Sequence, residues 1–542
     1  MARDLDRYRE ICDGFRWDTP ATFNFGADVV DRLARDGDGL ALIWQNEAGD
    51  LEEFNFSEMA RLSDRFANVL AGRGVGKGDR IIVMLPRIPQ WQVAVVGALK
   101  LGAVPIPCIE MLTARDLDYR ARHSGAKAVV ARADHAAKFA GLDDVLDVRI
   151  AVGAAEGWTD WETAMAAADA AFTPAVVGAE DPAILYYTSG STGHPKGVTH
   201  AARALHAWRV AAQYWLDLKP DDRIWCTADT GWSKAGTSIL FGPWSCGACA
   251  FFYDGPFDPR ARLDLLERHK VTVYCAPATE LNRVAHETIS DFDLSALRLT
   301  VSAGESVNPV VAERWQRATG IPVLEGYGLT EVLMLVHDYP FAPRKVGSMG
   351  LALPGTEVAI VDDAGRRLPA GAEGHIAVAM PHPQTMLGYR QDPERTAACY
   401  VEGPDGRWFL TGDRGSQDAD GYVFYAGRAD DVINSAGYRI GPIEVENVLL
   451  EHEAVQECAV VGVPDRERGE IVKAFVVLRD EAAGTDALAS ELQDHVKRLT
   501  APYKYPRAVA FVPDLPKTLT GKIKRQALRE REGAGTIASK PL

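Results

Sequence analysis

Short apolar runs alternate with longer amphipathic stretches along roughly the first two thirds of the chain. Runs such as Arg80–Leu85, Ala126–Ala131 and Arg223–Cys226 have the length and composition of strands. Between such runs, Trp91–Leu101 and Arg260–His269 have the length of helices. Strands that alternate with helices form parallel sheets covered by helices. The pattern therefore predicts an α/β fold with a large N-terminal domain built on parallel sheets.

Beyond Pro354 the pattern changes to short β-rich segments separated by turn sequences, which predicts a small β-barrel-like part. A smaller α+β unit follows, with one helix from Pro442 and another that carries an apolar stripe. We expect this stripe to pack against the core; it consists of Leu488, Leu492, Val496 and Leu499. The charged turn around Asp430 separates the patterns and predicts two domains, residues 1–429 and residues 430–542.

Composition and charge narrow the function class. With 47% hydrophobic and 25% charged residues, the chain has the balance of a soluble globular protein. A formal net charge of −16 disfavours nucleic acid and anionic membranes as partners, because both are polyanions. No apolar run is long enough to span a bilayer, and the first residues have mixed charge without an apolar core. We therefore expect a cytoplasmic protein without a membrane span.

The eight cysteines are scattered, mostly within apolar segments, which is typical of reduced thiols in the cytoplasm. Cys246 and Cys249 form a single Cys-x-x-Cys pair with no second pair elsewhere. A zinc site of this kind needs four ligands, so core packing is the favoured interpretation.

One stretch has the composition of a phosphate-binding loop. All six residues of 188–193 are hydroxyl-bearing or glycine, and Pro195, Lys196 and Gly197 follow. The stretch lies between an apolar run and the helical pattern 201–218, so we expect a strand-to-helix connection whose N–H groups surround a polyphosphate. A flexible linker is the alternative, but a linker does not need Lys196. The spacing differs from the Walker A motif, which disfavours an ordinary P-loop kinase.

Two further stretches carry candidate nucleotide ligands. Glu325–Glu331 follows an apolar strand and reads as a strand-end turn, in which Tyr327 offers a stacking face and Glu331 an oxygen ligand for Mg²⁺. Trp408–Asp413 ends another predicted strand with an acidic residue, a common way to bind ribose hydroxyls. Each of these signals is weak when taken alone.

Two stretches of the C-terminal region complete the set. One runs through Gly427–Asn434 and continues in Ala436–Gly441. The other, Leu515–Arg525, places Lys522 on a glycine-led turn just before a predicted helix. A solvated basic helix start is the alternative for Lys522. Positive charge at a helix start opposes the helix dipole, however, so a functional demand is plausible there.

Together, in this order, the five stretches resemble the AMP-forming acyl-CoA synthetases of the adenylate-forming superfamily, over roughly residues 30–532. Gly437–Pro442 and Ala501–Arg507 resemble the medium-chain branch in particular. The resemblance implies a two-step reaction. A carboxylate and Mg-ATP give acyl-AMP and pyrophosphate, and the thiol of CoA then displaces AMP. It also implies a mobile C-terminal domain with its hinge at Asp430, and a monomer or homodimer.

The resemblance also implies the residues of the adenylation site. The β- and γ-phosphates are assigned to Thr188, Ser189, Gly190, Ser191, Thr192, Gly193, His194, Pro195 and Lys196. The adenine and α-phosphate side is assigned to Glu325, Gly326, Tyr327, Gly328, Leu329 and Thr330. Glu331 matches the Mg²⁺ ligand, Asp413 and Arg428 match ribose contacts, and Lys522 matches the lysine that bridges the carboxylate and the α-phosphate.

For thioester formation the resemblance implies a second set of residues. Residues expected to contact CoA are Ala436, Gly437 and Tyr438 beside the pantetheine arm, and Arg468, Lys497, Tyr505, Pro506 and Arg507 nearer its phosphates. Arg439 matches a position that contacts phosphate or the acyl end. Arg468 and Lys497 could equally be surface charges.

The acyl pocket departs from the acetyl-CoA synthetases. Those enzymes carry a tryptophan directly after the aromatic residue of the adenine motif, where this chain has Gly328. The lack of this tryptophan predicts a deeper acyl pocket, suited to a medium-chain, branched or aromatic acid. Trp232 resembles an aromatic gate of the medium-chain branch, although an ordinary buried tryptophan is an equal interpretation. Ser233–Ala235 departs from the animal medium-chain pattern, which leaves the acid open.

Three alternatives remain beside the CoA ligase. An adenylating enzyme that loads a carrier protein is disfavoured by the candidate CoA-phosphate contacts. A luciferase-like oxygenase is disfavoured because the paired histidines of such proteins are missing near Trp232. A non-catalytic nucleotide or acyl sensor is disfavoured because a mere binder needs neither Glu331 nor Lys522.

Substitution of Lys522 tests the predicted division of the two steps. Lys522→Ala removes a fixed cation over developing negative charge, a contribution on the order of 10²–10³ in rate. We expect pyrophosphate release from acid plus ATP to be lost, while thioester formation from supplied acyl-AMP stays largely intact. Equal loss in both half-reactions would contradict the assigned role.

Overall fold

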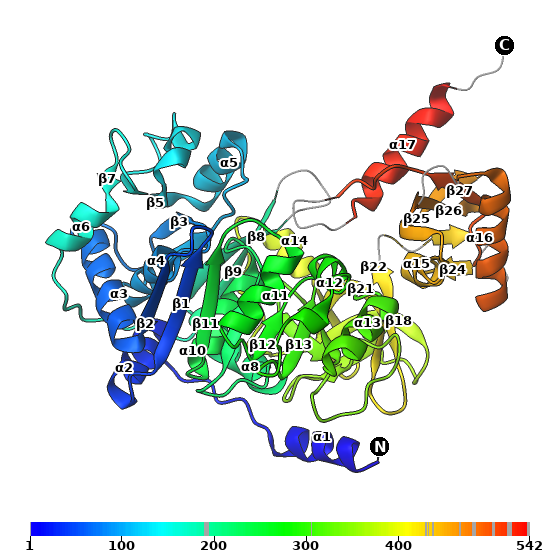
Figure 1. Cartoon of the computed structure of the whole chain (residues 1–542), viewed down its shortest axis with the longest axis horizontal. Helices are drawn as coiled ribbons and strands as arrows, with labels where there is room; N and C mark the ends of the chain where they lie inside the picture. The colour runs from blue at the N-terminus through cyan, green and yellow to red at the C-terminus, as the bar shows by residue number, and fades with distance from the viewer. Residues whose placement is uncertain are drawn as a thin grey trace.

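The computed structural model describes residues 2–188, 195–304, 306–428, 431, 433–435, 438–465, 468–479, 484–500, 504–517 and 523–538. Within this part of the chain, parallel-rich sheets and their covering helices form one large body, and a smaller unit lies at one end of it (Figure 1). The expected α/β class is confirmed. No helix among the described residues is long and apolar enough to cross a bilayer.

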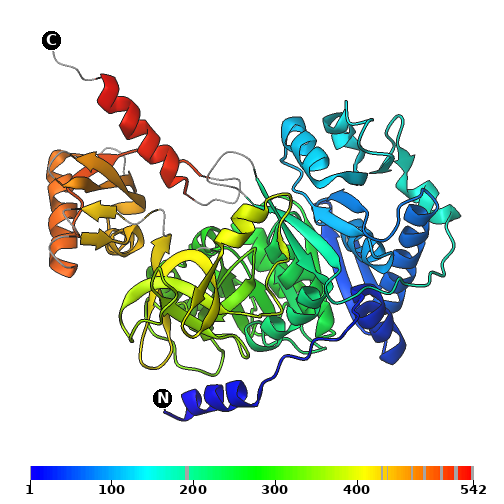
Figure 2. The ribbon, with the colours of Figure 1, turned by 180° about the vertical axis from the view of Figure 1, so that it is seen from behind.

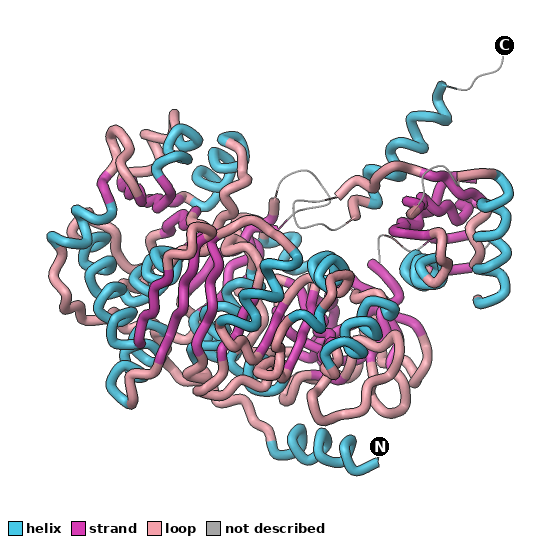
Figure 3. The backbone as a smooth tube through the Cα atoms, viewed as in Figure 1, coloured by secondary structure: helices cyan, strands magenta, loops and turns pink. Residues whose placement is uncertain are grey.

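A nine-stranded sheet forms the centre of the large body, where its strands run side by side (Figure 3). Its order is β16 (Leu351–Ala352), β15 (Leu333–His337), β14 (Val323–Leu329), β13 (Leu299–Ala303), β12 (Val273–Cys275), β10 (Arg223–Cys226), β11 (Cys249–Asp254), β1 (Leu40–Asn46) and β2 (Leu51–Asn55). The six strands from β14 to β1 pair in parallel, and the pairs at both edges are antiparallel. The carboxyl ends of the parallel strands therefore share one edge, where ligands bind in open α/β sheets.

Two smaller sheets complete the N-terminal half. One is parallel, in the order β4 (Val104–Pro107), β3 (Arg80–Met84), β5 (Ala126–Arg132), β6 (Val148–Val152) and β7 (Thr159–Asp160). The other is antiparallel, in the order β19 (Gly388–Tyr389), β9 (Lys196–Ala201) and β8 (Pro182–Thr188), and β8 lies against β4. The predicted parallel sheets are thus present. Strand β8, which precedes the predicted phosphate-binding loop, lies instead in the antiparallel three-stranded sheet.

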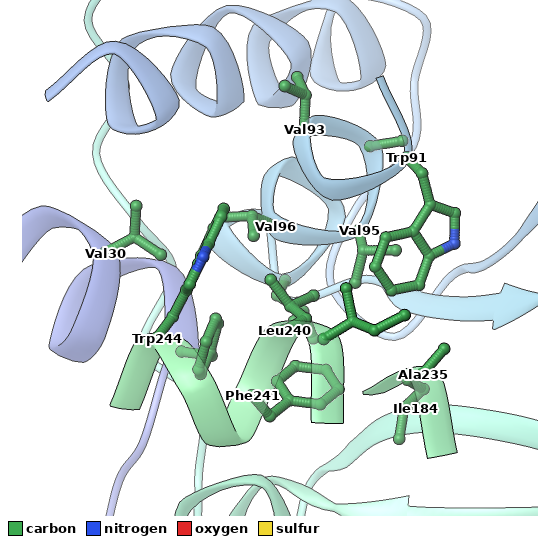
Figure 4. Close-up of a cluster of buried hydrophobic side chains, with 14 of the residues drawn as sticks. Val30, Trp91, Val93, Val95, Val96, Ile184, Ala235, Leu240, Phe241 and Trp244 are labelled. Carbon is green, nitrogen blue, oxygen red and sulfur yellow. The ribbon is translucent and has the colours of Figure 1, made fainter. Parts of the chain in front are cut away.

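The main core lies around helix α4 (Pro89–Lys100), which is buried on all its faces and so has no polar side. Figure 4 shows Trp91, Val95 and Val96 of α4 in the same cluster as Leu240 and Phe241. These two belong to the π-helical turn η3 (Gly236–Phe241), which continues into α10 (Gly242–Ser245). The other helical elements of this region are η1 (Gly26–Asp31), α2 (Arg32–Asp36), α3 (Phe56–Ala71), α5 (Ala114–Ser124), η2 (Ala133–Phe139) and α6 (Trp161–Ala167).

The remaining helices of the large body lie around its sheets, and the N-terminal helix lies at the border of the body (Figure 2). These are α1 (Ala2–Gly14), α7 (Ala202–Ala207), α8 (Arg209–Tyr214), α9 (Ser233–Ala235), α11 (Pro259–Arg268), α12 (Ala278–Val284), η4 (Ile289–Asp291) and α13 (Pro309–Thr319). The predicted β-rich part is a five-stranded antiparallel sheet with a short helix, α14 (Pro393–Ala398). Its strands are β17 (Val358–Val361), β18 (Glu373–Ala379), β21 (Gly406–Gln417), β20 (Tyr400–Gly403) and β22 (Val423–Arg428).

The C-terminal unit has its own sheet and its own apolar clusters. Its elements are β23 (Ile433–Ser435), β24 (Tyr438–Ile440), α15 (Pro442–Leu450), β25 (Val455–Asp465), β26 (Gly469–Leu478), α16 (Asp486–Leu499), β27 (Ala508–Phe511) and α17 (Arg525–Ala538). On α16, Leu492 and Val496 are fully buried as predicted. Leu499 is 54% exposed, so the expected stripe is wrong at its last position, where the helix ends.

Three sequence predictions about local structure are wrong. The glycine-rich stretch connects two antiparallel strands, because Thr188 pairs with Lys196, and the following helix begins only at Ala202. The stretch Glu325–Leu329 is part of strand β14 rather than a turn after it. Asp413 lies in the middle of β21, which continues to Gln417. In each case pairing with a neighbouring strand extends the β-structure into residues that have no strand-like hydrophobic pattern.

Candidate functional site

The hairpin of β8 and β9 brings the predicted phosphate lysine to the middle of the molecule. Residues 189–194, which include Ser189, Gly190, Ser191, Thr192, Gly193 and His194, lie outside the described part of the chain. Lys196 begins β9, directly after that stretch. Among the described residues no carboxylate lies within ion-pair distance of its ammonium group. The lysine is therefore available to an anion.

Glu331 and Lys196 meet at Tyr389, a residue that no sequence pattern marked. The Tyr389 hydroxyl donates a hydrogen bond of 2.7 Å to Oε1 of Glu331. The ammonium of Lys196 lies 5.2 Å from the centroid of the Tyr389 ring, within the range of a cation–π contact. Burial, and then Glu331, raise the pKa of the Tyr389 hydroxyl, so it remains a proton donor to the carboxylate. Tyr389 thus orients the candidate metal ligand beside the candidate phosphate lysine.

The turn between β14 and β15, Thr330 to Val332, is held by a second residue that the sequence did not reveal. His200, on β9, is fully buried and contacts the Thr330 carbonyl at 2.7 Å through Nε2. A carbonyl only accepts, so Nε2 carries the proton. Burial lowers the pKa of His200 to about 4. His200 lies four residues after Lys196, so both side chains are on one face of β9, which is the signal that could have found it.

The hydroxyl of Thr330 also contacts the segment that carries the candidate acyl gate. Its Oγ1 lies 3.3 Å from Oγ of Ser233, the residue after Trp232. Trp232 is half-buried and packs against an apolar cluster that includes Ile109 and Leu112. The ring therefore has apolar surroundings on one side, and the next residue, Ser233, contacts the Thr330 turn. Both interpretations of Trp232, gate and core residue, fit this position.

Tyr327 and Asp413, which the sequence assigns to the adenosine side, are in direct contact. The Tyr327 hydroxyl donates a hydrogen bond of 2.6 Å to Oδ2 of Asp413, across 86 positions of sequence. The centroid of the Tyr425 ring lies 6.2 Å from that of Tyr327. Asp413 faces Arg428 across the β21–β22 pair. The sequence-predicted aromatic residue and both predicted ribose contacts are thus brought to one place.

Glu325 supports this strand rather than a ligand. Its Oε1 accepts a hydrogen bond of 2.8 Å from the backbone of Val307, and its own N–H donates to Asp338. Burial, followed by the charge of Asp338, raises the pKa of Glu325 to about 7. Gly326 beside it leaves space for the Trp215 and Met334 side chains. The contacts of Glu325 thus hold the loop after β13 against β14.

Gly328 does not shape an acyl pocket in the expected way. A Cβ atom built on Gly328 would lie 1.9 Å from the backbone oxygen of Leu333, across the β14–β15 pair. The position therefore has no room for any side chain, and the premise that a tryptophan here would project into a pocket is wrong for this backbone. Leu333 itself has a φ of +57°, a conformation that a leucine rarely adopts. The close approach and the unusual φ together define the sharp turn that presents Thr330 and Glu331.

The candidate CoA contacts form one cluster in the C-terminal unit. The ring of Tyr505 has the Lys497 ammonium 4.3 Å and the Arg507 guanidinium 4.7 Å from its centroid. Arg507 also donates to the Tyr505 hydroxyl at 2.8 Å, and Lys497 pairs with Asp494. Pro506 is buried between the two residues it joins. No hydrogen bond, ion pair or ring contact among the described residues links Arg468 to this cluster.

The helix after Lys522 is anchored by a buried ion pair. Arg525, the first residue of α17, donates to both oxygens of Glu446 at 2.7 and 2.9 Å, and it lies 3.7 Å from Asp431. Arg529 of the same helix also pairs with Asp431. These contacts tie the start of α17 to the segment next to the predicted hinge. The predicted residues that lie outside the described part are Asp430, Ala436, Gly437 and Lys522, while Tyr438 and Arg439 lie on β24.

The residues fit a Mg²⁺ ion that is held mostly by its nucleotide. Glu331 supplies a carboxylate oxygen, the ligand type that Mg²⁺ prefers, and its Oε2 has no hydrogen-bond partner among the described residues. No group of three or more histidine, cysteine, aspartate or glutamate side chains in the described chain could hold a metal by itself. One carboxylate with phosphates and water is the usual set for Mg²⁺ at a nucleotide.

The arrangement agrees with the family to which the chain is similar. Residues 29–390 match the family described as AMP-binding enzyme, and residues 444–522 match the AMP-binding enzyme C-terminal domain. The chain therefore belongs to the AMP-binding enzyme family. The human mitochondrial acyl-coenzyme A synthetase ACSM4 is 41% identical over 535 residues, which cover 95% of this chain and 92% of that protein.

Two further relatives extend this picture. The acyl-CoA ligase YtcI of Bacillus subtilis (strain 168), described as uncharacterized, is 40% identical, with 95% of this chain and 97% of that protein covered. The crystal structure of the anthranilate CoA ligase AuaEII with anthranoyl-AMP superposes with a TM-score of 0.86 at 29% identity, covering 96% of this chain and 99% of that one. The expected resemblance to acyl-CoA synthetases, and with it an enzyme of the acid–thiol ligase type, is confirmed.

Substitution of His200 tests whether it holds the Thr330 turn. His200→Phe leaves a buried carbonyl without its donor, which costs about 1–3 kcal/mol. We expect acyl-AMP formation, trapped with hydroxylamine, to fall by about 10- to 100-fold. His200→Gln keeps an N–H donor and should recover most of the rate. Equal rates for the two variants would show that the hydrogen bond does not matter.

The pH dependence of stability gives a separate prediction for the same residue. Because burial lowers the pKa of His200 to about 4, the folded protein keeps the ring neutral while the unfolded chain protonates it near pH 6.5. The stability that the neutral ring provides is therefore present above pH 6.5 and lost as the pH falls toward 4. Relative to His200→Gln, the wild type should lose roughly 3 kcal/mol of unfolding free energy over this range in urea titrations. A pH-independent difference would contradict the buried neutral state.

Proposed function

We propose that this enzyme is an ATP-dependent carboxylate–CoA ligase for medium-chain, branched or aromatic acids. It joins the acid to AMP, releases pyrophosphate, and then transfers the acyl group to CoA with release of AMP. The observation that carries the proposal is the turn at Thr330 and Glu331. It lies between a lysine available to phosphate on one side and the Tyr327–Asp413 pair on the other.

In the first step the chain's own groups hold the nucleotide and balance its charge. Asp413 accepts from a ribose hydroxyl, and Tyr327 keeps that carboxylate oriented through its 2.6 Å hydrogen bond. Lys196 contacts the β- and γ-phosphates, and Glu331, oriented by Tyr389, is the protein ligand of Mg²⁺, which neutralises phosphate charge when bound. The carboxylate oxygen attacks the α-phosphorus, and the bond to the pyrophosphate oxygen breaks.

Lys522 supplies the cation that this attack needs. The carboxylate and the α-phosphate are both anionic, so their approach is opposed unless a positive group lies between them. The Arg525–Glu446 pair fixes the start of α17, which follows Lys522 by three residues in the sequence. The separation of Lys522 from the rest of the site in sequence supports a C-terminal domain, residues 430–542, that moves about Asp430.

In the second step the CoA thiol replaces AMP on the acyl carbonyl. The thiol gives up its proton to solvent, its sulfur bonds to the carbonyl carbon, and the carbon–oxygen bond to AMP breaks. The proposal assigns Ala436, Gly437 and Tyr438 to the pantetheine arm, and Arg439 to phosphate or the acyl end. The Lys497–Tyr505–Arg507 cluster presents two cations to the phosphates of CoA, which supports CoA over a carrier protein.

The choice of acid rests on the apolar surroundings of Trp232. They favour acids that bury hydrocarbon or an aromatic ring. The anthranilate CoA ligase among the similar structures acts on an aromatic acid, which supports the same range here. All eight cysteines are free thiols, which supports a reducing compartment, and we propose the cytoplasm; the human relative is named as mitochondrial. A monomer or homodimer is part of the same proposal.

A panel of acids tests the proposal directly. Acetate, butyrate, hexanoate, octanoate, isovalerate and benzoate are assayed for AMP formation that requires both ATP and CoA. Each additional buried methylene contributes about 0.8 kcal/mol, or about fourfold in kcat/KM. We expect kcat/KM to rise by more than tenfold from acetate to hexanoate, or for benzoate.

The same assay separates the alternatives. A preference for acetate would contradict the proposed pocket. AMP formation without any need for CoA, but with acyl transfer to a carrier protein, would replace the ligase by a carrier-loading enzyme. Absence of AMP with every acid would favour a sensor.

A further inference from the structure

A cationic cavity lies beside the hairpin and shares only Pro195 and Lys196 with the residues assigned above to the nucleotide. It has a volume of about 240 Å³, against about 30 Å³ for one water molecule in the liquid, so it can hold a small hydrated anion. Its walls come from α5, from the start of β9, and from β19 with the segment after it. The lining residues are Tyr119, His123, Pro195, Lys196, Gly197, Tyr389, Arg390, Asp392 and Arg395.

Arg390 is the residue of this cavity whose positive charge indicates an anionic ligand. Its backbone N–H donates to the Gly197 carbonyl at 2.7 Å, which places it beside Lys196. Its Nε contacts the His123 carbonyl at 3.3 Å, but no acceptor for its terminal nitrogens is present in the described part of the chain. Burial, and then the charge of Arg80, lower the pKa of Arg390. A half-buried guanidinium beside a second one, without an acid, is unfavourable unless an anion joins it.

The one acid in the cavity does not neutralise Arg390. Asp392 accepts from the backbone N–H of Arg395 at the start of α14, and its other oxygen lies 3.5 Å from the Arg395 guanidinium. Arg80 directs its own nitrogens to the backbone carbonyls of Gly78, Ser124 and Gly125. The cavity therefore keeps an excess of positive charge at Arg390 and Lys196.

The position of this charge indicates which anion it takes. Lys196 and Tyr389 both line the cavity, and Tyr389 donates to Glu331, so the cavity adjoins the side of the site where the β- and γ-phosphates are expected. Arginine binds phosphate oxygens with two parallel hydrogen bonds, and the terminal nitrogens of Arg390, which have no acceptor among the described residues, can supply that geometry. Tyr119 donates to the Pro195 carbonyl and His123 contacts Tyr187, so these walls are polar and already ordered.

We propose that this cavity is a transient binding site through which pyrophosphate leaves the enzyme, and that Arg390 binds the leaving group after Lys196. The proposal rests on the proposed function, because it needs an adenylation step that releases pyrophosphate. No covalent bond forms or breaks in the cavity, because the anion only moves from one cation to the next. Arg390 contributes to the departure of product and not to the binding of ATP.

The test compares pyrophosphate with ATP in variants of the full-length enzyme. Arg390→Gln should weaken inhibition of acyl-AMP formation by added pyrophosphate by about 10-fold, the usual effect of losing one charge-assisted hydrogen bond. The KM for ATP should change by less than twofold. Arg390→Lys should recover part of the effect. Arg122→Gln is the matched control, because that exposed guanidinium on α5 is paired with Asp118 and Asp144.

A binding measurement without turnover tests the cavity independently of the proposed function. Calorimetry with pyrophosphate is carried out on the wild type and on Arg390→Gln, with the nucleotide site filled by α,β-methylene-ATP. We expect pyrophosphate to bind the wild type and to bind the variant at least 10-fold more weakly. If no acid supports AMP formation, this calorimetric measurement still shows whether the cavity binds pyrophosphate.

Three results would overturn the proposal. The first is unchanged pyrophosphate inhibition and binding in Arg390→Gln. The second is an equal rise in the KM for ATP, which would make Arg390 part of the ATP site itself. The third is a variant that no longer distinguishes CoA from dephospho-CoA, which would assign the guanidinium to the 3′-phosphate of CoA instead of pyrophosphate.

Discussion

One turn, Thr330 to Val332, connects three sheets of this protein, and the geometry of the candidate site depends on it. The turn closes β14 onto β15 at the edge of the nine-stranded sheet. The Thr330 carbonyl accepts from His200 of the three-stranded sheet, and Glu331 accepts from Tyr389 of the same sheet. From the strand before the turn, Tyr327 donates to Asp413 of the antiparallel sheet. Because interiors are close-packed, a shift of any one sheet would be transmitted to the turn.

The turn can be this sharp only because of its backbone. Gly328 lies so close to the Leu333 carbonyl that no side chain fits between them, and Leu333 takes a positive φ. Residues in such conformations are stabilised by their surroundings and are frequent at functional sites. Here the surroundings are the buried His200 and the packed neighbours of Leu333. The Glu331 carboxylate and the Thr330 hydroxyl are therefore held in place by the fold itself.

The charges of the site are divided between two parts of the chain. In the proposed function the large body supplies the acids, Glu331 and Asp413, together with Lys196 and Arg390 on the phosphate side. The same proposal assigns Lys522 and the cations around Tyr505 to the C-terminal unit. A polyanionic substrate and a net charge of −16 make such local cations necessary, because the overall field repels phosphate.

The sequence by itself determined the fold class, the order of the chemical motifs and most strand positions, because apolar runs and glycine–hydroxyl clusters are local properties of the chain. It did not reveal where β14 and β21 end, since pairing with a neighbouring strand carries polar residues into a sheet. His200, Tyr389 and Arg390 were also not foreseen. Their roles arise from contacts with residues 58 to 267 positions away, which only tertiary packing brings together. The structure alone decided that Gly328 faces a backbone carbonyl, because that depends on the register of two paired strands and not on residue type.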